Sequence, residues 1–114
     1  MPKETQDVIT KLTKNQALLV ISKGPGLGSR FLLDKSEIYI GREMKNDVVL
    51  DDITVSRSHA LIKVGNELTI KDLGSLNGTY VNSKITAQST LTAGDEIQIG
   101  KFHMNIFCNP WTKM

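Results

Sequence analysis

Short runs of strand-forming residues, each ended by turn residues, recur along most of the chain. The runs cover residues 17–21, 30–33, 37–40, 48–50, 60–64, 68–71, 79–81, 96–99 and 102–107. Glycine, proline, asparagine, aspartate and serine fill the breaks between them. Strands at this spacing with such punctuation are typical of an all-β sandwich or barrel. No internal repeat or low-complexity segment interrupts the pattern.

Alternation along the last run supports this fold class. Every second residue is apolar, and the apolar set is Phe102, Met104, Ile106 and Cys108. The residues between them are mostly polar. Because successive side chains of a strand point to opposite faces, this pattern predicts a strand with one face in a core.

Two of the breaks are predicted to be hairpin turns. Gly65-Asn66 lies between two strand-type runs and fits a two-residue hairpin, since both residues tolerate a positive φ. Residues 24–28 read Gly-Pro-Gly-Leu-Gly. This stretch lacks the Lys-Ser/Thr pair of a phosphate-binding loop, so we expect a hairpin between the first two strands.

The two ends of the chain lack the strand-type runs of its middle part. Residues 1–16 are mostly polar, and three apolar residues, Val8, Ile9 and Leu12, are too few to hold a short helix in water. We therefore expect a flexible N-terminal tail over residues 1–16, one domain over residues 17–108 and a C-terminal tail over residues 109–114. A length of 114 residues also favours a single domain.

Composition excludes several classes of function. The net charge is +2, and the 14 basic residues are scattered singly. Nucleic-acid binders usually show a basic stripe, so any anion bound here should be small and local. Cys108 is the only cysteine, which excludes a disulfide framework and a cysteine-based metal site. The sequence has no apolar run of 18 residues, so we expect a cytoplasmic monomer with no membrane span and no cofactor or metal.

Three segments break the strand pattern with unusual polar residues. They are Gly41-Arg42, residues 56–59 (Ser-Arg-Ser-His) and residues 74–79 (Gly-Ser-Leu-Asn-Gly-Thr), with Asn82 beyond. The guanidinium of Arg42 is suited to phosphate oxygens, and Ser56 offers a hydroxyl donor. The amide of Asn77 carries a donor and an acceptor, which suits the main chain of an extended peptide.

Topology predicts that two of these segments are neighbours. The strands on either side of Gly65-Asn66 form a hairpin, so its outer ends meet at one edge of the sandwich. The loop around Ser56 precedes that hairpin and the loop around Asn77 follows it. Strand counting alone leaves open the end of the sandwich at which Arg42 lies.

A catalytic interpretation of Ser56 and His59 is not supported. One serine near one histidine, with no acid to orient the imidazole, is usually structural. His59 begins a strand-type run and is expected to brace its loop through hydrogen bonds. We predict that the protein is not an enzyme.

Taken together, these segments resemble the signature of the forkhead-associated (FHA) domain. The signature consists of Gly41-Arg42, Ser56-x-x-His59, Asn77-Gly78 and Asn82, and the resemblance covers about residues 17–107. It implies an 11-stranded β-sandwich that binds phosphothreonine peptides through loops at one end, with Arg42 there. The sequence departs from many members at Ser83, where they have glycine.

The resemblance also implies a role for each matching residue. Arg42 and Ser56 should contact the phosphate, and Arg57 and Asn77 the peptide backbone. Leu76 and Thr79 occupy positions that line the pocket edge. Four further positions are architectural in the family, namely Gly41, His59, Gly78 and Asn82.

A narrower resemblance is to the small actinobacterial FHA regulators of 2-oxoglutarate and glutamate metabolism. It rests on residues 17–20, 28–34, 51–57 and 94–102. It implies inhibition of 2-oxoglutarate dehydrogenase, phosphorylation of the tail by serine/threonine kinases, and binding of the phosphorylated tail by its own domain. Thr5 matches the first threonine of the family's pair, whereas Gln6 replaces the second. A plain adaptor that recruits phosphorylated kinases is the alternative.

Overall fold

The computed structural model describes residues 3–13 and 15–108. Within these residues it contains one helix and eleven strands. In chain order they are α1 (Lys3–Thr10), β1 (Ala17–Lys23), β2 (Arg30–Leu33), β3 (Glu37–Gly41), β4 (Val48–Val49), β5 (Ala60–Val64), β6 (Leu68–Asp72), β7 (Thr79–Val81), β8 (Lys84–Ile85), β9 (Gln88–Leu91), β10 (Glu96–Ile99) and β11 (Phe102–Phe107).

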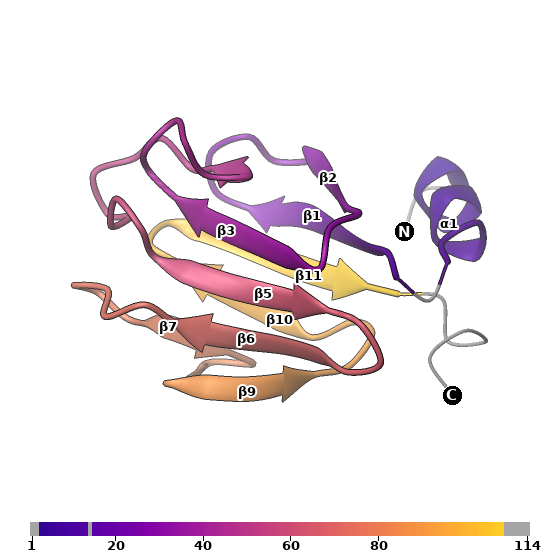
Figure 1. The fold of residues 1–114 in the computed structure, drawn as a ribbon. Helices are drawn as coiled ribbons and strands as arrows, with labels where there is room; N and C mark the ends of the chain where they lie inside the picture. The colour runs from indigo at the N-terminus through magenta and orange to yellow at the C-terminus, as the bar shows by residue number, and fades with distance from the viewer. Residues whose placement is uncertain (1–2, 14, 109–114) are drawn as a thin grey trace.

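The strands form two stacked sheets. The six-stranded sheet has the order β2-β1-β11-β10-β7-β8, and the five-stranded sheet has the order β4-β3-β5-β6-β9 (Figure 1). All pairs are antiparallel except β3 with β4. The prediction of an 11-stranded all-β sandwich is confirmed.

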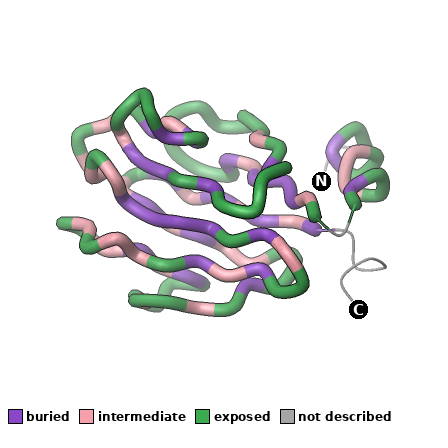
Figure 2. Tube along the Cα trace, viewed as in Figure 1, coloured by how far each residue is buried: buried purple, intermediate pink, exposed green. Residues whose placement is uncertain are grey.

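The core lies between the sheets. Buried and half-buried residues alternate along β11, whose inward side chains are Phe102, Met104 and Ile106. Ile62 on β5 and Ile70 on β6 are wholly buried on the facing sheet. Figure 2 shows this as buried segments alternating with exposed ones along the strands and as mainly exposed loops. The cysteine predicted to pack in the core, Cys108, is buried.

The two ends of the sandwich carry different parts of the chain. The loops after β3, before β5 and after β6 lie at one end, whereas α1 and the start of β1 lie at the other (Figure 1). The molecule measures 36 Å along its longest axis. The polar segments singled out in the sequence therefore lie far from the N-terminal helix.

Two strands and one turn differ from expectation. β8 and β9 were not among the strand-type runs, because Lys84 and Ile85 are exposed and β9 has only one buried residue, Leu91. The β5–β6 turn has three residues rather than two, since Val64 pairs with Leu68. Neither Gly65 nor Asn66 has a positive φ, so the predicted tight turn is wrong. The 24–28 stretch does connect β1 to β2 as predicted.

The N-terminal segment also differs from expectation, because residues expected to be a flexible tail form α1. The helix does not stand alone in water, since Thr5 and Leu12 are buried. Thr5 lines a cavity together with residues of β1 and β11, so the helix packs against the domain, whereas an isolated eight-residue helix would be unstable in water. The C-terminal tail of residues 109–114 lies outside the described residues. No helix in the described part of the chain has the length and apolarity to cross a membrane.

Candidate functional site

Gly41 ends β3 at a point where the backbone of another loop passes very close. A Cβ atom at Gly41 would lie 2.2 Å from the carbonyl oxygen of Arg57 and 2.7 Å from Nδ2 of Asn46. Only glycine leaves room for this approach. The approach brings the next residue beside the β4–β5 loop, where the backbone N–H of Arg42 donates to the carbonyl of Ser56 at 3.0 Å.

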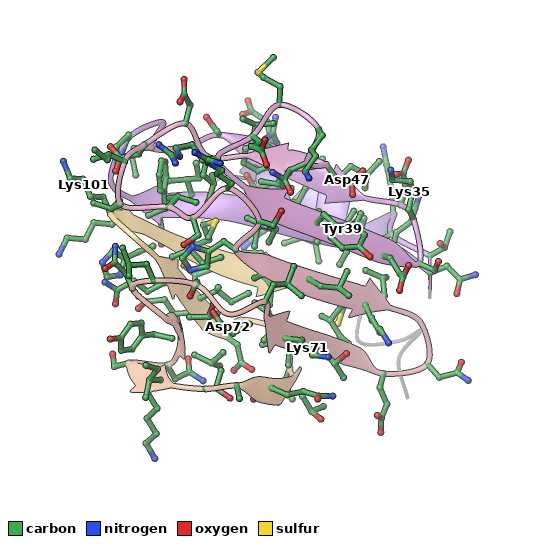
Figure 3. All side chains as sticks on the ribbon, turned by 60° about the vertical axis from the view of Figure 1, so that its left-hand side comes forward. Lys35, Tyr39, Asp47, Lys71, Asp72 and Lys101 are labelled. Carbon is green, nitrogen blue, oxygen red and sulfur yellow. The ribbon has the colours of Figure 1, made fainter. Side chains whose placement is uncertain are left out.

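Asn46 fastens the β3–β4 loop to the β4–β5 loop. Its Nδ2 donates to the carbonyls of Glu43 and Arg57, both at 2.8 Å, and its side chain is buried. The far end of the β3–β4 loop is held by Asp47, which pairs with Lys35 and accepts the backbone N–H of Tyr39 (Figure 3). The Lys35 ammonium and that N–H hold the pKa of the Asp47 carboxyl below its usual range.

His59 joins the β4–β5 loop to the β6–β7 loop from a fully buried position. Its Nδ1 accepts the backbone N–H of Ser56 at 3.0 Å, and its Nε2 lies 2.9 Å from the carbonyl of Gly78. Because Nδ1 is an acceptor, the proton sits on Nε2 and is donated to Gly78. The neutral imidazole is thus a fixed brace between two loops.

Ser56 is held with its hydroxyl at the surface of the loop. Its Oγ accepts the backbone N–H of Leu76 at 3.0 Å, which ties the two loops a second time. The hydroxyl hydrogen is donated to no group in the described residues. It therefore remains available to an incoming acceptor.

Asn77 is oriented in a similar way. Its Nδ2 donates to the carbonyl of Thr54 at 3.0 Å. Thr54 is itself fixed, because its Oγ1 accepts the N–H of Lys101 at 3.1 Å and its hydroxyl and N–H both bond Asp52. This leaves the Asn77 amide oxygen and its second N–H free to pair with a peptide. The contacts confirm that the loops around Ser56 and Asn77 are neighbours.

Asp72 organises the β6–β7 loop from the end of β6. Its carboxylate accepts the N–H groups of Gly74 and Ser75, each at 3.0 Å, and the hydroxyls of Ser75 and Thr79 at 2.5 and 2.7 Å. Partial burial raises the pKa of Asp72, but these hydrogen bonds together hold it below its usual range. Figure 3 labels Asp72 among the side chains of the loop end.

These contacts build one cavity of about 370 Å³ at the loop end. The lining residues are Arg42, Ile53, Thr54, Val55, Ser56, Arg57, Ser58, Leu76 and Asn77. Within the described residues, no carboxylate pairs with either guanidinium. The site thus combines two unpaired cations, the free hydroxyl hydrogen of Ser56 and one oriented amide.

The remaining predicted residues lie elsewhere. Thr79 is fully buried and donates its hydroxyl to Asp72, so the structure does not bring it to the cavity. Gly78 has a φ of +86°, and its carbonyl is the acceptor for His59. Asn82 bridges β7 to β10, since it donates to Asp95 at 3.1 Å and accepts the N–H of Glu96 at 3.0 Å.

Sequence reasoning missed three residues that shape the site. Asn46, Thr54 and Asp72 were not among the predicted site residues. For Asp72 and Thr54, however, the sequence contains a local pattern that indicates their hydrogen bonds. Asp72 precedes Gly74-Ser75, a pattern in which an aspartate accepts N–H groups two and three residues later. Asp52 stands two residues before Thr54 in the same way. Nothing in the sequence marks Asn46, whose role depends on a contact eleven residues away.

The chemistry of the cavity is recognition of an anion attached to an extended chain. Guanidinium and hydroxyl groups take phosphate oxygens through charge-assisted hydrogen bonds. An oriented amide beside them can bond a peptide main chain. The described residues contain no group of three or more His, Cys, Asp or Glu placed to hold a metal ion.

Comparison with known proteins gives consistent results. Residues 38–100 match the model of the FHA domain. The chain is 48% identical over 100 residues to the glycogen accumulation regulator GarA of Mycobacterium tuberculosis, covering 87% of this chain and 62% of the regulator. It is 50% identical over 99 residues to the oxoglutarate dehydrogenase inhibitor of Corynebacterium jeikeium, covering 86% of this chain and 68% of the inhibitor.

The chain thus spans less than two thirds of the length of the glycogen accumulation regulators. Both relatives are named as a regulator or an inhibitor, in agreement with the prediction that the chain is not an enzyme.

Solved structures resemble the fold as a whole. One, from a study of phosphothreonine-dependent FHA domain interactions, has a TM-score of 0.76 at 30% identity and covers 83% of this chain and 98% of its own. Another, EmbR of Mycobacterium tuberculosis in complex with a low-affinity phosphopeptide, has a TM-score of 0.77 at 29% identity. It covers 92% of this chain and 28% of its own.

Proposed function

This chain belongs to the FHA-domain family, and on that premise we propose that it is a phosphothreonine-binding signalling module whose cavity is formed by the three loops described above. The observation that carries the proposal is the convergence of Arg42, Ser56 and Asn77 on one cavity. Each comes from a different loop, and each offers a hydrogen-bonding group that the protein itself leaves free.

The phosphate is taken by Arg42 and Ser56. Arg42 is half-buried and its backbone is fixed to Ser56, so little of its main-chain freedom is lost on binding. Each charge-assisted hydrogen bond to the phosphate contributes about 1.5–3 kcal/mol. Two or three such bonds, added to contacts with the peptide, support an affinity in the micromolar range.

The peptide backbone is held by Arg57 and Asn77. The carbonyl of Arg57 is bonded by Asn46 and Glu43, which leaves its side chain exposed beside the cavity. Leu76 lines the cavity edge, whereas Thr79 contributes through Asp72 rather than by contact. Gly41, His59, Gly78 and Asn82 act by shaping the loops.

We further propose that the protein regulates metabolic enzymes, among them 2-oxoglutarate dehydrogenase or enzymes of glutamate metabolism, in the cytoplasm. The names of its relatives support this role. So do three exposed apolar side chains, Met44, Ile53 and Leu76, which are 85–90% exposed on the loops around the cavity. Exposed apolar groups gathered at one end favour contact with another protein.

A kinase switch completes the proposal. A serine/threonine kinase phosphorylates Thr5, and the phosphorylated tail then occupies the cavity and excludes other partners. Pull-down of 2-oxoglutarate dehydrogenase by the unphosphorylated protein tests the metabolic role. If the enzyme is absent from the bound fraction while phosphorylated kinases are present, the protein is instead a plain adaptor.

Substitution of Arg42 tests the central proposal. Titration calorimetry with a phosphothreonine peptide should show affinity lower by at least about a hundredfold for Arg42→Ala, because a charge and its hydrogen bonds are lost. The fold should be intact, since the Arg42 side chain forms no ion pair within the described residues. Lys63→Ala, which removes an exposed cation from β5, is the control. Unchanged affinity in folded Arg42→Ala would remove Arg42 from the site.

A further inference from the structure

Thr5 is buried although its neighbours on the helix are exposed. Its side chain is 6% exposed, whereas Glu4, Gln6 and Asp7 are all exposed. Thr5 is the buried residue of α1, and Leu12 just beyond the helix is 4% exposed. One side of the N-terminal segment is therefore turned toward the domain.

The surface beneath α1 is the outer face of the six-stranded sheet. Leu18 pairs across the sheet with Phe107 and Leu32, on the face opposite to the core residues Leu19 and Ile106. Leu18 is only 3% exposed although it lies outside the central core cluster. An outward side chain can be that buried only if another segment covers it.

Thr5 closes a cavity of about 370 Å³ on this face. The other lining residues are Val20, Ile21, Ser22, Gly28, Asn105 and Phe107. None of them is charged. Arg30, the cross-strand neighbour of Val20, is exposed and does not line the cavity.

The docked helix disfavours a phosphate on Thr5. A group with a charge of about −1.5 to −2 would enter a cavity that no cation lines, which is unfavourable unless the helix moves away. The position of α1 also matters, because it lies at the end of the sandwich opposite the loop cavity (Figure 1). A kinase, which must hold its threonine in an extended and open segment, cannot reach Thr5 in this state.

The helix must also unwind before its threonine can reach the loops. Ala17 lies twelve positions after Thr5, and this segment spans about 40 Å when fully extended. With residues 5–10 helical at about 1.5 Å each, the span falls to about 30 Å. The molecule is 36 Å long, so only the unwound tail has reach to spare.

We propose that α1 is a latch whose docking on the outer face of β1 and β11 protects Thr5 from phosphorylation, and that phosphorylation locks the latch open. The docked helix and the tail-occupied cavity are mutually exclusive states of one chain. Only the later binding of the phosphorylated tail in the loop cavity rests on the proposed function. The protection of Thr5 depends on the outer face of β1 and β11 alone.

Thiol labelling measures the protection without requiring the kinase. Thr5→Cys and, as the matched exposed control, Gln6→Cys are treated with iodoacetamide, and labelled sites are read by mass spectrometry. Thr5→Cys should react about tenfold more slowly than Gln6→Cys, because reaction waits for the helix to open. Adding Phe107→Ser should bring the two rates within about twofold, whereas Tyr39→Ser on the other sheet should not. Equal rates in the otherwise native chain would overturn the latch.

Phosphothreonine encoded genetically at position 5 tests the locking step. The amide signals of Val20, Asn105 and Phe107 should shift on phosphorylation, and those of residues 3–10 should become coil-like. Both changes should persist with Arg42→Ala, which disables the loop cavity and so separates release of the helix from the proposed function. If the phosphorylated helix stays docked, for example through Arg30, the locking step is wrong.

Discussion

Ser56 shows how one side chain can serve both the fold and the ligand. Its oxygen accepts the N–H of Leu76, and its carbonyl accepts the N–H of Arg42, so the residue links all three loops. A hydroxyl has one hydrogen and two lone pairs, and here only one lone pair is used internally. The hydrogen is what remains for a phosphate.

We predict that Ser56→Ala weakens phosphopeptide binding less than Arg42→Ala. The variant loses one neutral donor to a charged acceptor, worth about 1.5 kcal/mol or roughly tenfold in affinity. It should also unfold slightly more easily, because the Leu76 N–H loses its acceptor. Titration calorimetry and urea unfolding measure the two effects, with Ser36→Ala in an exposed turn as control. An affinity equal to that of the native protein would mean that Ser56 does not contact the phosphate.

Residue types in short motifs predicted most of this site but not its internal contacts. Arg42, Ser56 and Asn77 could be identified because they break a strand pattern with groups suited to phosphate and peptide. Asn46 could not, because its partners are set by the close approach of two loops at Gly41. Thr79 was predicted at the pocket edge because its position lines the pocket in the family. It is instead buried beneath the loop, which the neighbouring residues in the sequence did not indicate.

At the scale of elements, periodicity predicted the strands that bury one face. β10 and β11 alternate clearly and their bounds were predicted as observed. β8 and β9 were not predicted, because edge strands with exposed polar residues bury too few apolar side chains to produce a hydrophobic alternation. The family resemblance supplied the total of eleven strands that periodicity alone did not.

The β6–β7 loop should loosen in acid through Asp72. The pKa of this carboxyl is lowered in the folded state from an ordinary value of 3.8. A group with a depressed folded pKa stabilises the fold above its unfolded pKa, and that contribution is lost as the pH falls through the lower folded value. Urea unfolding between pH 6 and pH 2.5 should therefore show a weaker acid dependence for Asp72→Asn than for the native protein.

The control is Asp51→Asn, which changes an exposed carboxylate outside this network. Phosphopeptide affinity at pH 6 should fall for Asp72→Asn but not for Asp51→Asn, because only Asp72 positions the loop that carries Asn77. If both variants lose stability in parallel with pH, Asp72 has no special part in the acid dependence.

Glycine at position 83, in the β7–β8 turn, should stabilise the fold. Asn82 and Ser83 have φ of +49° and +69°, the left-handed region of a two-residue hairpin turn. Serine is strained there and glycine is not, although glycine loses more freedom on folding. We predict that Ser83→Gly raises the free energy of unfolding by up to about 1 kcal/mol. Thermal unfolding measures this, and Ser89→Gly within β9 should have the opposite sign.

At the scale of the whole molecule, the main feature is that the loop cavity and Thr5 lie at opposite ends of the sandwich. The loop cavity lies at one end and the helix with Thr5 at the other (Figure 1). Sequence reasoning predicted a flexible tail over residues 1–16 but not the helix that forms there. Thr5 of the helix shares a cavity with Val20 of β1 and Phe107 of β11, which come together only when β1 pairs with β11.

We predict that phosphorylated Thr5, once released, occupies the cavity of its own chain. A tether of about twelve residues gives an effective concentration on the order of millimolar. Against a peptide dissociation constant of about 1 µM, this favours the closed form by about a thousand to one. Phosphorylation should therefore shift the amide signals of Ser56, Arg57 and Asn77 at every protein concentration, and Arg42→Ala should abolish these shifts. The apparent mass should stay that of a monomer.

Shortening the tail tests whether closure is intramolecular. Deleting residues 11–14 leaves seven residues between Thr5 and Ala17, so eight residue steps span at most about 28 Å when extended. This is well short of the 36 Å length of the molecule, so the phosphothreonine should no longer reach its own cavity. It should instead enter the cavity of a second copy, and light scattering should show dimers that form with rising concentration. If the shortened phosphoprotein remains a monomer with shifted Ser56 and Asn77 signals, the distance argument is wrong.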